Sequence, residues 1–362
     1  MHKIKYYQNN FLDQARKRTD PLADAAIKSI FESGRAADFR NIIHSLDHNN
    51  YSLPNGLPLE VKDFFDQSRQ LPQWADVQLI QKGQKFFRTH ATSLSFMLAL
   101  MSLPYDYAAA DGAQVLWLSK RMRDDTGKRL LETGKYVFDV ASPEGFSAKG
   151  SAIASAQKVR LIHATIRYHI LKKRDWNVVW GMPINQEDMA GTNLSMSLIP
   201  VRGMRKLGIK VSKDESEAYI HLWNVASYVM GVEEKLLPDT SKEAFLLNKM
   251  ITERHFKPSE AGRGLTNALL SYMHDTMDAR LKTLAPQYMR FLLGEKVADI
   301  LDIPYVSLPE GFILNPLKYW NQLRSLMNAH PDTYFDALHL FNSNVRKQEG
   351  AKVSMKIPTH LS

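Results

Sequence analysis

The feature that most constrains this sequence is its helical periodicity. Segment after segment places apolar residues three or four positions apart, and proline and glycine fall between these segments. Asp20 and Pro21, for example, have the residue types of a helix cap and first turn, and Gly34 ends the apolar stripe that follows. No run alternates between apolar and polar residues for long. The pattern therefore predicts an all-α protein.

The periodic segments give the expected helix boundaries. The segment 74–101 is predicted as one helix or as two, and 177–180 as a single short strand. A proline-rich link covers 304–316, and the residues after 345 are polar. We expect one all-α domain over 1–345, with additional N- and C-terminal helices around its core, followed by a polar tail over 346–362. The predicted helices cover 20–34, 59–70, 74–101, 106–120, 125–140, 151–173, 183–199, 214–230, 242–256, 259–284, 286–301 and 315–329.

The residues that are missing exclude several kinds of site. The 362 residues contain no cysteine, which excludes a disulfide scaffold, a thiolate-bound zinc or iron–sulfur centre and a thiol nucleophile. The chain also lacks the glycine-rich phosphate loops, the Gly-x-Ser-x-Gly turn of hydrolases and the His-Glu-x-x-His motif of metalloproteases. The paired Glu-x-x-His repeats of a di-iron bundle are absent too. Histidine is left as the natural ligand for iron.

The chain is basic, with 47 Lys and Arg residues against 38 Asp and Glu, which gives a net charge of +9. These charges are spread along the sequence, which favours a solvated basic surface, with attraction to nucleic acid or to an anionic membrane as the alternative. The N-terminus shows no export signal, and the apolar run 94–103 is too short to span a bilayer. We expect a cytoplasmic protein with no transmembrane segment, no nucleic-acid partner and at most peripheral contact with a membrane.

One histidine, His163, lies in the middle of an apolar helix face. Helical spacing groups it with Val159 and Ile166, and it places Arg160 and Arg167 on either side. A lone histidine on such a face is usually a core residue with a satisfied hydrogen bond. The alternative is a haem ligand, because an imidazole that binds haem iron needs a dry wall and a neutral ring, and the haem propionates attract arginine.

Two further segments concentrate polar groups. Helical spacing brings Arg129, Glu132 and Thr133 together on one turn. The segment 183–192 is polar at the start of a helix that is apolar afterwards. Its structural interpretation is a capped helix, with Asn185 as the cap and two acidic residues at the positive end of the helix, and its functional interpretation is part of a site.

These segments resemble the latex clearing protein (rubber oxygenase) family and its wider relatives, the MpaB-like oxygenases. The resemblance covers about 71–231, with weaker similarity on either side. The ordered set Arg129-x-x-x-Thr133, Arg160-x-x-His163 and Thr192 is its most specific part. The stretches that carry it read LPYDYAAADGAQVL, RLLETGKYVFDV, VRLIHATIR and WGMPINQEDMAGT.

The resemblance implies a globin-like helical core around a b-type haem. By this resemblance His163 is the proximal iron ligand, and Arg129 and Thr133 match positions on the distal side, near where oxygen binds. The family oxygenates or cleaves carbon–carbon double bonds of isoprenoid chains with molecular oxygen. The positions that match residues close to the cofactor are Arg160, Arg167 and Thr192.

The sequence departs from the rubber-cleaving pattern in four respects. Glu132 stands where rubber oxygenases have a lysine that can cap the iron, and an unpaired carboxylate beside haem would resist ionising. The family's proposed catalytic base falls near Ala113, where this chain has no Glu, and Leu194 replaces a histidine. The missing export signal is the fourth departure. These changes leave the haem assignment in place but argue against solid rubber as the substrate.

We therefore expect a haem b-dependent oxygenase, of the dioxygenase type, that uses O2 on the double bonds of a hydrophobic, isoprenoid- or lipid-like molecule, with room for an unidentified electron donor. A haem-binding protein without turnover, serving as a sensor, carrier or electron-transfer module, is the alternative. A helical binding protein without haem is a third hypothesis. The expected site consists of Arg129, Glu132 and Thr133 as catalytic residues and of His163, Arg160, Arg167 and Thr192 as cofactor-binding residues, with His163 as the metal ligand.

Overall fold

The computed structural model describes residues 7–119, 125–173, 176–276, 284–305, 321 and 334–349. These residues form helices and contain no strand, which confirms the all-α prediction. The α-helices are α1 Asn9–Ala15, α2 Pro21–Glu32, α3 Ala36–Ser45, α4 Leu59–Ser68, α5 Val77–Met97, α6 Leu103–Tyr107, α7 Ala110–Leu118, α9 Thr126–Ala141, α10 Ala152–Lys173, α11 Gln186–Lys206, α12 Lys213–Val229, α13 Ser241–His255, α14 Glu260–Thr276, α16 Leu284–Leu293, α17 Glu295–Ile300 and α20 Tyr334–Glu349.

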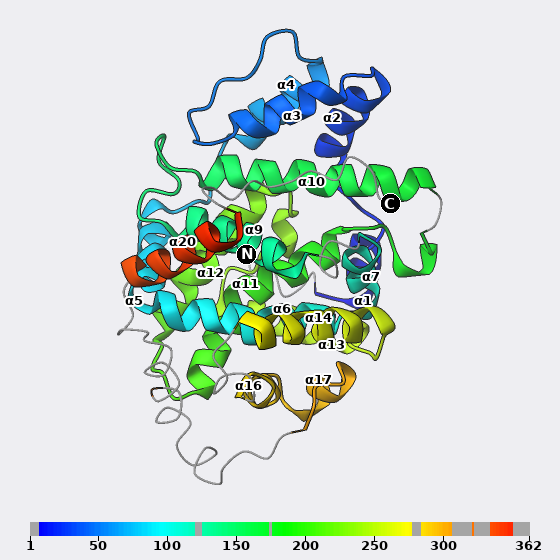
Figure 1. Cartoon of the computed structure of the whole chain (residues 1–362). Coiled ribbons are helices and arrows are strands. Elements are labelled where there is room, and N and C mark those ends of the chain that lie inside the picture. The colour runs from blue at the N-terminus through cyan, green and yellow to red at the C-terminus, as the bar shows by residue number, and fades with distance from the viewer. Residues whose placement is uncertain are drawn as a thin grey trace.

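Helix α10 lies between two groups of helices and packs against both (Figure 1). On one side α2, α3 and α4 form a small apolar unit, to which α10 contributes Leu161 and Ala164. On the other side lies the main bundle, which buries Ile153 and Ala156 of α10. Because α10 is covered on both sides, a polar residue in its middle lies deep inside the protein.

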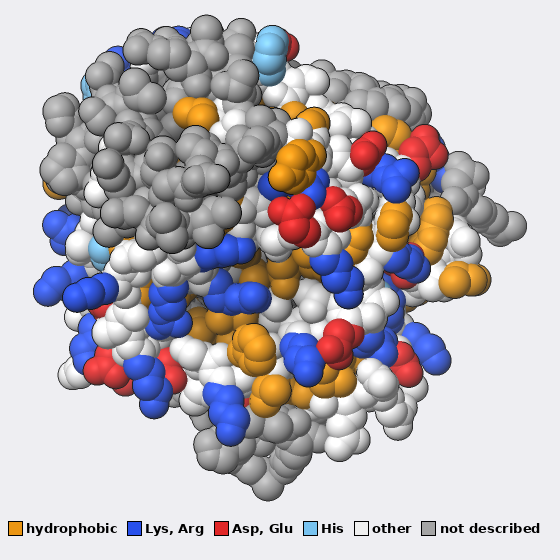
Figure 2. Space-filling view, turned by 90° about the horizontal axis from the view of Figure 1, so that it is seen from below, with side chains coloured by type: hydrophobic (Ala, Val, Ile, Leu, Met, Phe, Trp, Pro, Cys, Tyr) orange, Lys and Arg blue, Asp and Glu red, His pale blue; other side chains and the backbone are white. Residues whose placement is uncertain are grey.

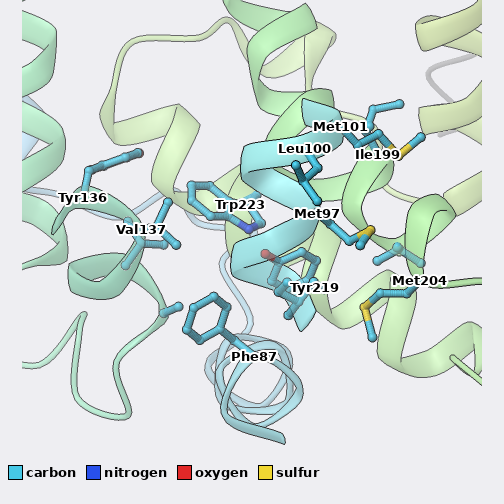
Figure 3. Close-up of a cluster of buried hydrophobic side chains, with 14 of the residues drawn as sticks. Phe87, Met97, Leu100, Met101, Tyr136, Val137, Ile199, Met204, Tyr219 and Trp223 are labelled. Carbon is cyan, nitrogen blue, oxygen red and sulfur yellow. The ribbon is translucent and has the colours of Figure 1, made fainter. Parts of the chain in front are cut away.

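The main core is built on the close packing of α5 against α12 (Figure 3). Gly83 permits this contact, because a Cβ atom there would lie 2.6 Å from the Ala218 carbonyl oxygen. Trp223 of α12 lies against Tyr136 of α9, with ring centroids 5.9 Å apart. Met97 belongs to the same buried cluster. The apolar run 94–103 is therefore part of the core.

The segment predicted as one helix or two is a single helix with a kink. Within α5, His90 has non-helical backbone angles, with φ −122° and ψ 23°. The chain then continues through a π-helical turn, Leu98–Ser102, into α6, which has Pro104 in its first turn. A π-helical turn and a proline are both known causes of bends in helices.

Several predicted elements differ from those in the structure. Helix α11 continues through Pro200 to Lys206 instead of ending at residue 199, because Pro200, Val201, Gly203 and Met204 are buried and their packing outweighs the lost hydrogen bond. The predicted strand 177–180 is a 3-10 turn, Val178–Trp180, in which both valines are exposed. The predicted helix 286–301 is divided at Gly294, which has φ 83°.

Other differences concern the ends of the chain. Helices α1, α3 and α20 were not predicted, and the expected boundary at 345/346 falls inside α20. The predicted helix 315–329 lies outside the described residues, apart from residue 321. The single domain over 1–345 stays a prediction.

Basic residues are spread over the surface, as the sequence predicted. On the face in Figure 2, basic side chains lie among acidic and hydrophobic ones. Within the part of the chain that is described, no helix combines the length and the apolar composition needed to cross a membrane.

Candidate functional site

His163 lies at the centre of α10 and is half-buried. Its Nδ1 atom is fully buried and has no hydrogen-bond partner, so its accessible surface lies elsewhere on the ring. Burial, together with the positive charges of Arg167 and Arg129, lowers the pKa of His163 to about 3. The imidazole is therefore neutral at physiological pH, with a lone pair available to a ligand.

The α9 turn that carries Arg129, Glu132 and Thr133 is assembled as predicted. The Arg129 guanidinium lies 3.6 Å from a carboxylate oxygen of Glu132, and the Thr133 hydroxyl donates to the Arg129 carbonyl oxygen at 3.1 Å. The Glu132 side chain is only 3% exposed, whereas that of Arg129 is 32% exposed. Glu132 is thus paired, so the cost of an unpaired carboxylate does not arise here. Since the charge of Arg129 is felt by His163, this turn belongs to the surroundings of His163.

The two arginines beside His163 have different environments. Arg160 binds Asp20, with Nε 2.5 Å and Nη2 2.8 Å from its two carboxylate oxygens, and its Nη1 donates to the Val229 carbonyl at 3.0 Å. It therefore ties the cap of α2 to α10 and to the end of α12. Every nitrogen of this guanidinium has a protein acceptor.

Arg167, by contrast, has one guanidinium nitrogen without an acceptor in the protein. Its Nε donates to Asp24 at 2.7 Å and its Nη1 to the Ile184 carbonyl at 3.3 Å. Its Nη2 is buried without any partner. A buried guanidinium donor without an acceptor is costly, which marks this position as one where a ligand can supply the acceptor.

Thr192 lies on a polar face of α11. It is exposed, and its hydroxyl donates to the Asp188 carbonyl at 3.1 Å. One turn further on, the Ser195 hydroxyl donates to the Thr192 carbonyl at 2.9 Å and to the Asp106 carboxylate at 2.8 Å. The helix start has the expected cap, because the Asn185 side chain accepts from the Asp188 backbone N–H at 2.9 Å.

Asp106 is a group that the sequence analysis missed. Burial raises the pKa of its carboxyl to about 7; the hydrogen bond from Ser195 opposes this rise and the nearby charge of Asp188 contributes to it. Asp106 therefore exchanges a proton near neutral pH, unlike an ordinary aspartate. The available signal was an aspartate between two tyrosines in an otherwise apolar segment, 103–110.

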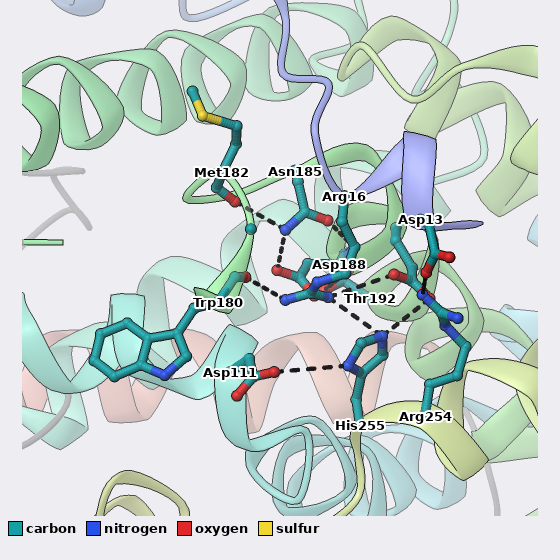
Figure 4. A network of polar contacts seen from close by, with 12 residues as sticks. Asp13, Arg16, Asp111, Trp180, Met182, Asn185, Asp188, Thr192, Arg254 and His255 are labelled. Carbon is teal, nitrogen blue, oxygen red and sulfur yellow. Dashed lines mark hydrogen bonds and ion pairs between the residues drawn. The ribbon is translucent and has the colours of Figure 1, made fainter. Parts of the chain in front are cut away.

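Beside this face lies a second polar cluster, which we call the Arg16 network (Figure 4). Arg16 donates to Asp188 at 2.9 Å, and Glu187 accepts from Arg254 at 2.8 Å and lies 3.0 Å from His255 Nε2. Burial raises the pKa of Glu187, but its hydrogen bonds and ion pairs with His255 and Arg254 outweigh burial, and the net shift is downward. The Arg16 network consists of Arg16, Glu187, Asp188, Arg254 and His255 and ties the N-terminal segment to α11 and α13.

The residues of these clusters do not form a metal cage. Among the described residues, no group of three or more His, Asp and Glu side chains is placed to hold a metal ion. A metal centre in this part of the chain would therefore need ligands from elsewhere, as when a porphyrin supplies four of them and a single histidine a fifth.

Comparison with known proteins identifies the family. Residues 87–317 match the family described as ER-bound oxygenase mpaB/B'/Rubber oxygenase, catalytic domain. The chain is 25% identical over 297 residues to rubber oxygenase of Streptomyces sp. (strain K30), which covers 81% of this chain and 73% of that protein. It also shares its fold with latex clearing protein in the closed state, with a TM-score of 0.78, 24% identity and 95% of each chain covered.

The family match extends over more than half of the chain and includes α9, α10 and α11. It confirms both the resemblance and the prediction of an oxygenase. The assignments of individual site residues stay predictions. This chain belongs to the mpaB/B' and rubber oxygenase catalytic-domain family and is an enzyme of the oxygenase type.

Proposed function

We propose that this protein is a haem b-dependent oxygenase that uses O2 to oxygenate or cleave the carbon–carbon double bonds of a hydrophobic, isoprenoid- or lipid-like molecule. The observation that carries the proposal is the position of two unmatched polar groups one turn apart on α10. His163 is neutral and half-buried on an apolar face, and Arg167 has a buried nitrogen without an acceptor. Family membership supports the oxygenase chemistry.

The residues present fit a haem group. His163 would hold the iron through Nε2, because Nδ1 is the buried nitrogen. Arg167 would donate its unmatched Nη2 to a propionate, for which a guanidinium is well suited. When bound, haem supplies the redox chemistry that activates O2. We reassign Arg160 to a positioning role, since all its nitrogens already bind the protein.

The α9 turn would orient the reacting groups. The Arg129 guanidinium is paired with Glu132 at 3.6 Å, and its positive charge can stabilise negative charge that develops on oxygen. Thr133 donates its hydroxyl proton to the backbone, which leaves its oxygen as an acceptor on the same turn. Glu132 would then act by holding Arg129 in place of capping the iron.

Asp106 is our candidate for the acid–base group that the Ala113 position does not provide. The Ser195 hydroxyl fixes one of its carboxylate oxygens and links it to the α11 face that carries Thr192. A carboxyl with a pKa of about 7 can both accept and donate a proton at neutral pH. We expect the oxygenase rate to follow the ionisation of Asp106, with the pH dependence lost in Asp106→Asn.

The first experiment is an absorption spectrum of the purified protein with pyridine extraction of the pigment. We expect a Soret band, a haem b product, and more than a tenfold loss of bound haem in His163→Ala. His274→Ala is the matched control, because His274 is 65% exposed on α14 and should keep the band. A colourless protein that also fails to bind added haemin would refute the proposal.

Turnover is tested separately, on the haem-loaded protein. Oxygen uptake is followed with squalene as an unsaturated probe, and carbonyl products are trapped as hydrazones. We expect uptake that depends on squalene, that yields carbonyl products and that falls to background in His163→Ala. Haem binding without any uptake, over a panel of unsaturated lipids, would contradict the proposed activity on double bonds.

A further inference from the structure

The turn between α10 and α11 exposes an unusual amount of apolar surface. Val178 is 84% exposed and Val179 is 81% exposed, the two highest fractions among the large hydrophobic side chains of the described residues. Leu171, at the end of α10, is also exposed, at 42%. Adjacent exposed aliphatic side chains are costly in water and indicate a contact surface.

This turn is held rigidly. The Asn177 side chain accepts from the Val179 N–H at 3.0 Å, and Gly181 adopts a left-handed conformation with φ 78°. The Trp176 indole donates to the Gly181 carbonyl at 2.6 Å, and Arg16 donates to the Trp180 carbonyl. With its backbone fixed in this way, the turn keeps its valines in water instead of folding them onto the body of the protein.

The neighbouring side chains have the chemistry of a bilayer interface. Trp176 and Trp180 are half-buried beside the valines, with ring centroids 5.1 Å apart. Lys172 and Lys173 are exposed in the last turn of α10. Aliphatic side chains enter the acyl region, tryptophan prefers the headgroup level, and lysine is attracted to anionic lipids.

We propose that this surface docks the protein on an anionic lipid bilayer. We call it the apolar tip and define it by Leu171, Lys172, Lys173, Trp176, Val178, Val179 and Trp180. The valines insert, the two indoles lie at the headgroup level, and the lysines bind lipid phosphates and carboxylates. Docking of this kind is peripheral and reversible, because the inserted apolar area is small.

A second copy of the chain fits this surface less well. In a two-fold dimer the same patch meets itself, so Lys172 and Lys173 of both copies would be brought together. The tip is also a single turn, whereas a stable interface buries about 800 Å² on each partner. Charge and size therefore both favour a membrane.

The tip also connects to the proposed site. Ile166 and Ile170 lie one and two turns after His163 on the same face of α10, and they pack with Trp176 in a small apolar cluster. A packed apolar cluster thus lies between His163 and the apolar tip along α10. If the proposed function holds, a lipid-soluble substrate would reach the enzyme from the bilayer on this side, but docking itself does not depend on that chemistry.

The test measures binding of the full chain to sedimented vesicles of phosphatidylcholine, with and without phosphatidylserine. We expect binding to the anionic vesicles and a loss of about tenfold or more in the partition coefficient of Val178→Ser/Val179→Ser. Lys172→Gln/Lys173→Gln should lose about tenfold on anionic vesicles only. The control is Leu59→Ser/Val77→Ser, which removes side chains that are 69% and 61% exposed elsewhere on the surface and should bind as the wild type.

A second readout locates the contact. Brominated phosphatidylcholine should quench part of the tryptophan emission, and Trp176→Phe/Trp180→Phe should lose that part. Wild-type protein that stays in the supernatant with both vesicles overturns the proposal, as does a valine variant that binds like the wild type. A wild-type dimer that becomes monomeric in the valine variant, without vesicle binding, would assign the tip to self-association instead. Since no turnover is measured, a failure here is distinct from a failure of the proposed oxygenase activity.

Discussion

Two buried polar regions lie on either side of the start of α11, and they differ in how their charges are satisfied. In the Arg16 network each charged group has a partner of opposite charge, as Glu187 has with Arg254 and His255. Around His163, one imidazole nitrogen and one nitrogen of Arg167 are buried without partners. Ion pairs hold the Arg16 network together, although Nδ1 of His255 makes no hydrogen bond and lies 4.0 Å from the Asp111 carboxylate. The buried nitrogens near His163 leave positions that a ligand could fill. From this comparison we expect the first region to act mainly in stability and the second in ligand binding.

The strongest challenge to this comparison is to remove the centre of the Arg16 network. Glu187→Ala removes the buried carboxylate that Arg16, Arg254 and His255 share, leaving Arg16 with Asp188 and Arg254 with Asp13, and should lower the free energy of unfolding by about 3 kcal/mol. Chemical denaturation measures this change. In the control Glu253→Ala, whose side chain is 64% exposed in its pair with Lys249, the change should stay within about 0.5 kcal/mol. If Glu187→Ala is as stable as the control, the Arg16 network has no structural role.

Asp106 makes the stability of the folded protein depend on pH. The folded-state pKa of about 7 is above the ordinary 3.8, so between these values the folded protein binds more protons than the unfolded chain. The stability contribution of Asp106 therefore falls as pH rises through this range and is lowest above pH 7. Asp106→Asn should be more stable than the wild type by about 1–3 kcal/mol near pH 8 and similar to it near pH 4. Melting curves of both proteins at pH 4 and pH 8 measure this. An equal stability difference between the variant and the wild type at both pH values would contradict the prediction.

Matched histidine variants sharpen the contrast between the two regions. His255→Leu removes the partner of Glu187 and should destabilise the protein by about 1–3 kcal/mol. His163→Leu replaces a ring with an unsatisfied buried nitrogen, so the haem-free protein should lose no more than about 1 kcal/mol, while haem binding is abolished. Unfolding and pigment are measured on the same preparations. The reverse order of the two stabilities would show that His163 is the structural residue.

The smallest effect on stability is expected at Thr192. Its side chain is exposed and its hydroxyl bonds only to the carbonyl of its own helix, so Thr192→Val should change the unfolding free energy by less than about 0.5 kcal/mol. If this residue contacts the cofactor or substrate, the same variant should shift the Soret band or lower the turnover rate. A variant identical to the wild type in stability, spectrum and rate would remove Thr192 from the site.

The local features of the molecule follow from the sequence. Helical spacing was enough to group Arg129 with Glu132 and Thr133 and to place His163 on an apolar face, because residues three or four positions apart are neighbours on any helix. The cap of α11 by Asn185 is local in the same way. The family match confirms that the specific order of these residues was a sound basis for recognising an oxygenase.

Where local rules competed with packing, the sequence analysis was wrong. Proline at position 200 predicted a helix end, but the helix continues because Val201 and Met204 are buried in the core. Two adjacent valines predicted a strand, but no partner strand exists for them among the described residues, and they form the exposed 3-10 turn of the apolar tip. Tertiary contacts decide such cases, since propensities differ by less than the free energy of burial.

By itself, the sequence determined the helical class of this protein, the composition of each helix face and the family to which it belongs. Only the tertiary structure decided which polar groups are already paired. Arg160 and Arg167 look alike in the sequence, yet Asp20 satisfies one of them and a buried nitrogen of the other is left without a partner. The physical reason is that pairing and burial depend on residues more than a hundred positions apart, as between Arg160 and Asp20, whereas helical periodicity depends on neighbours in the chain.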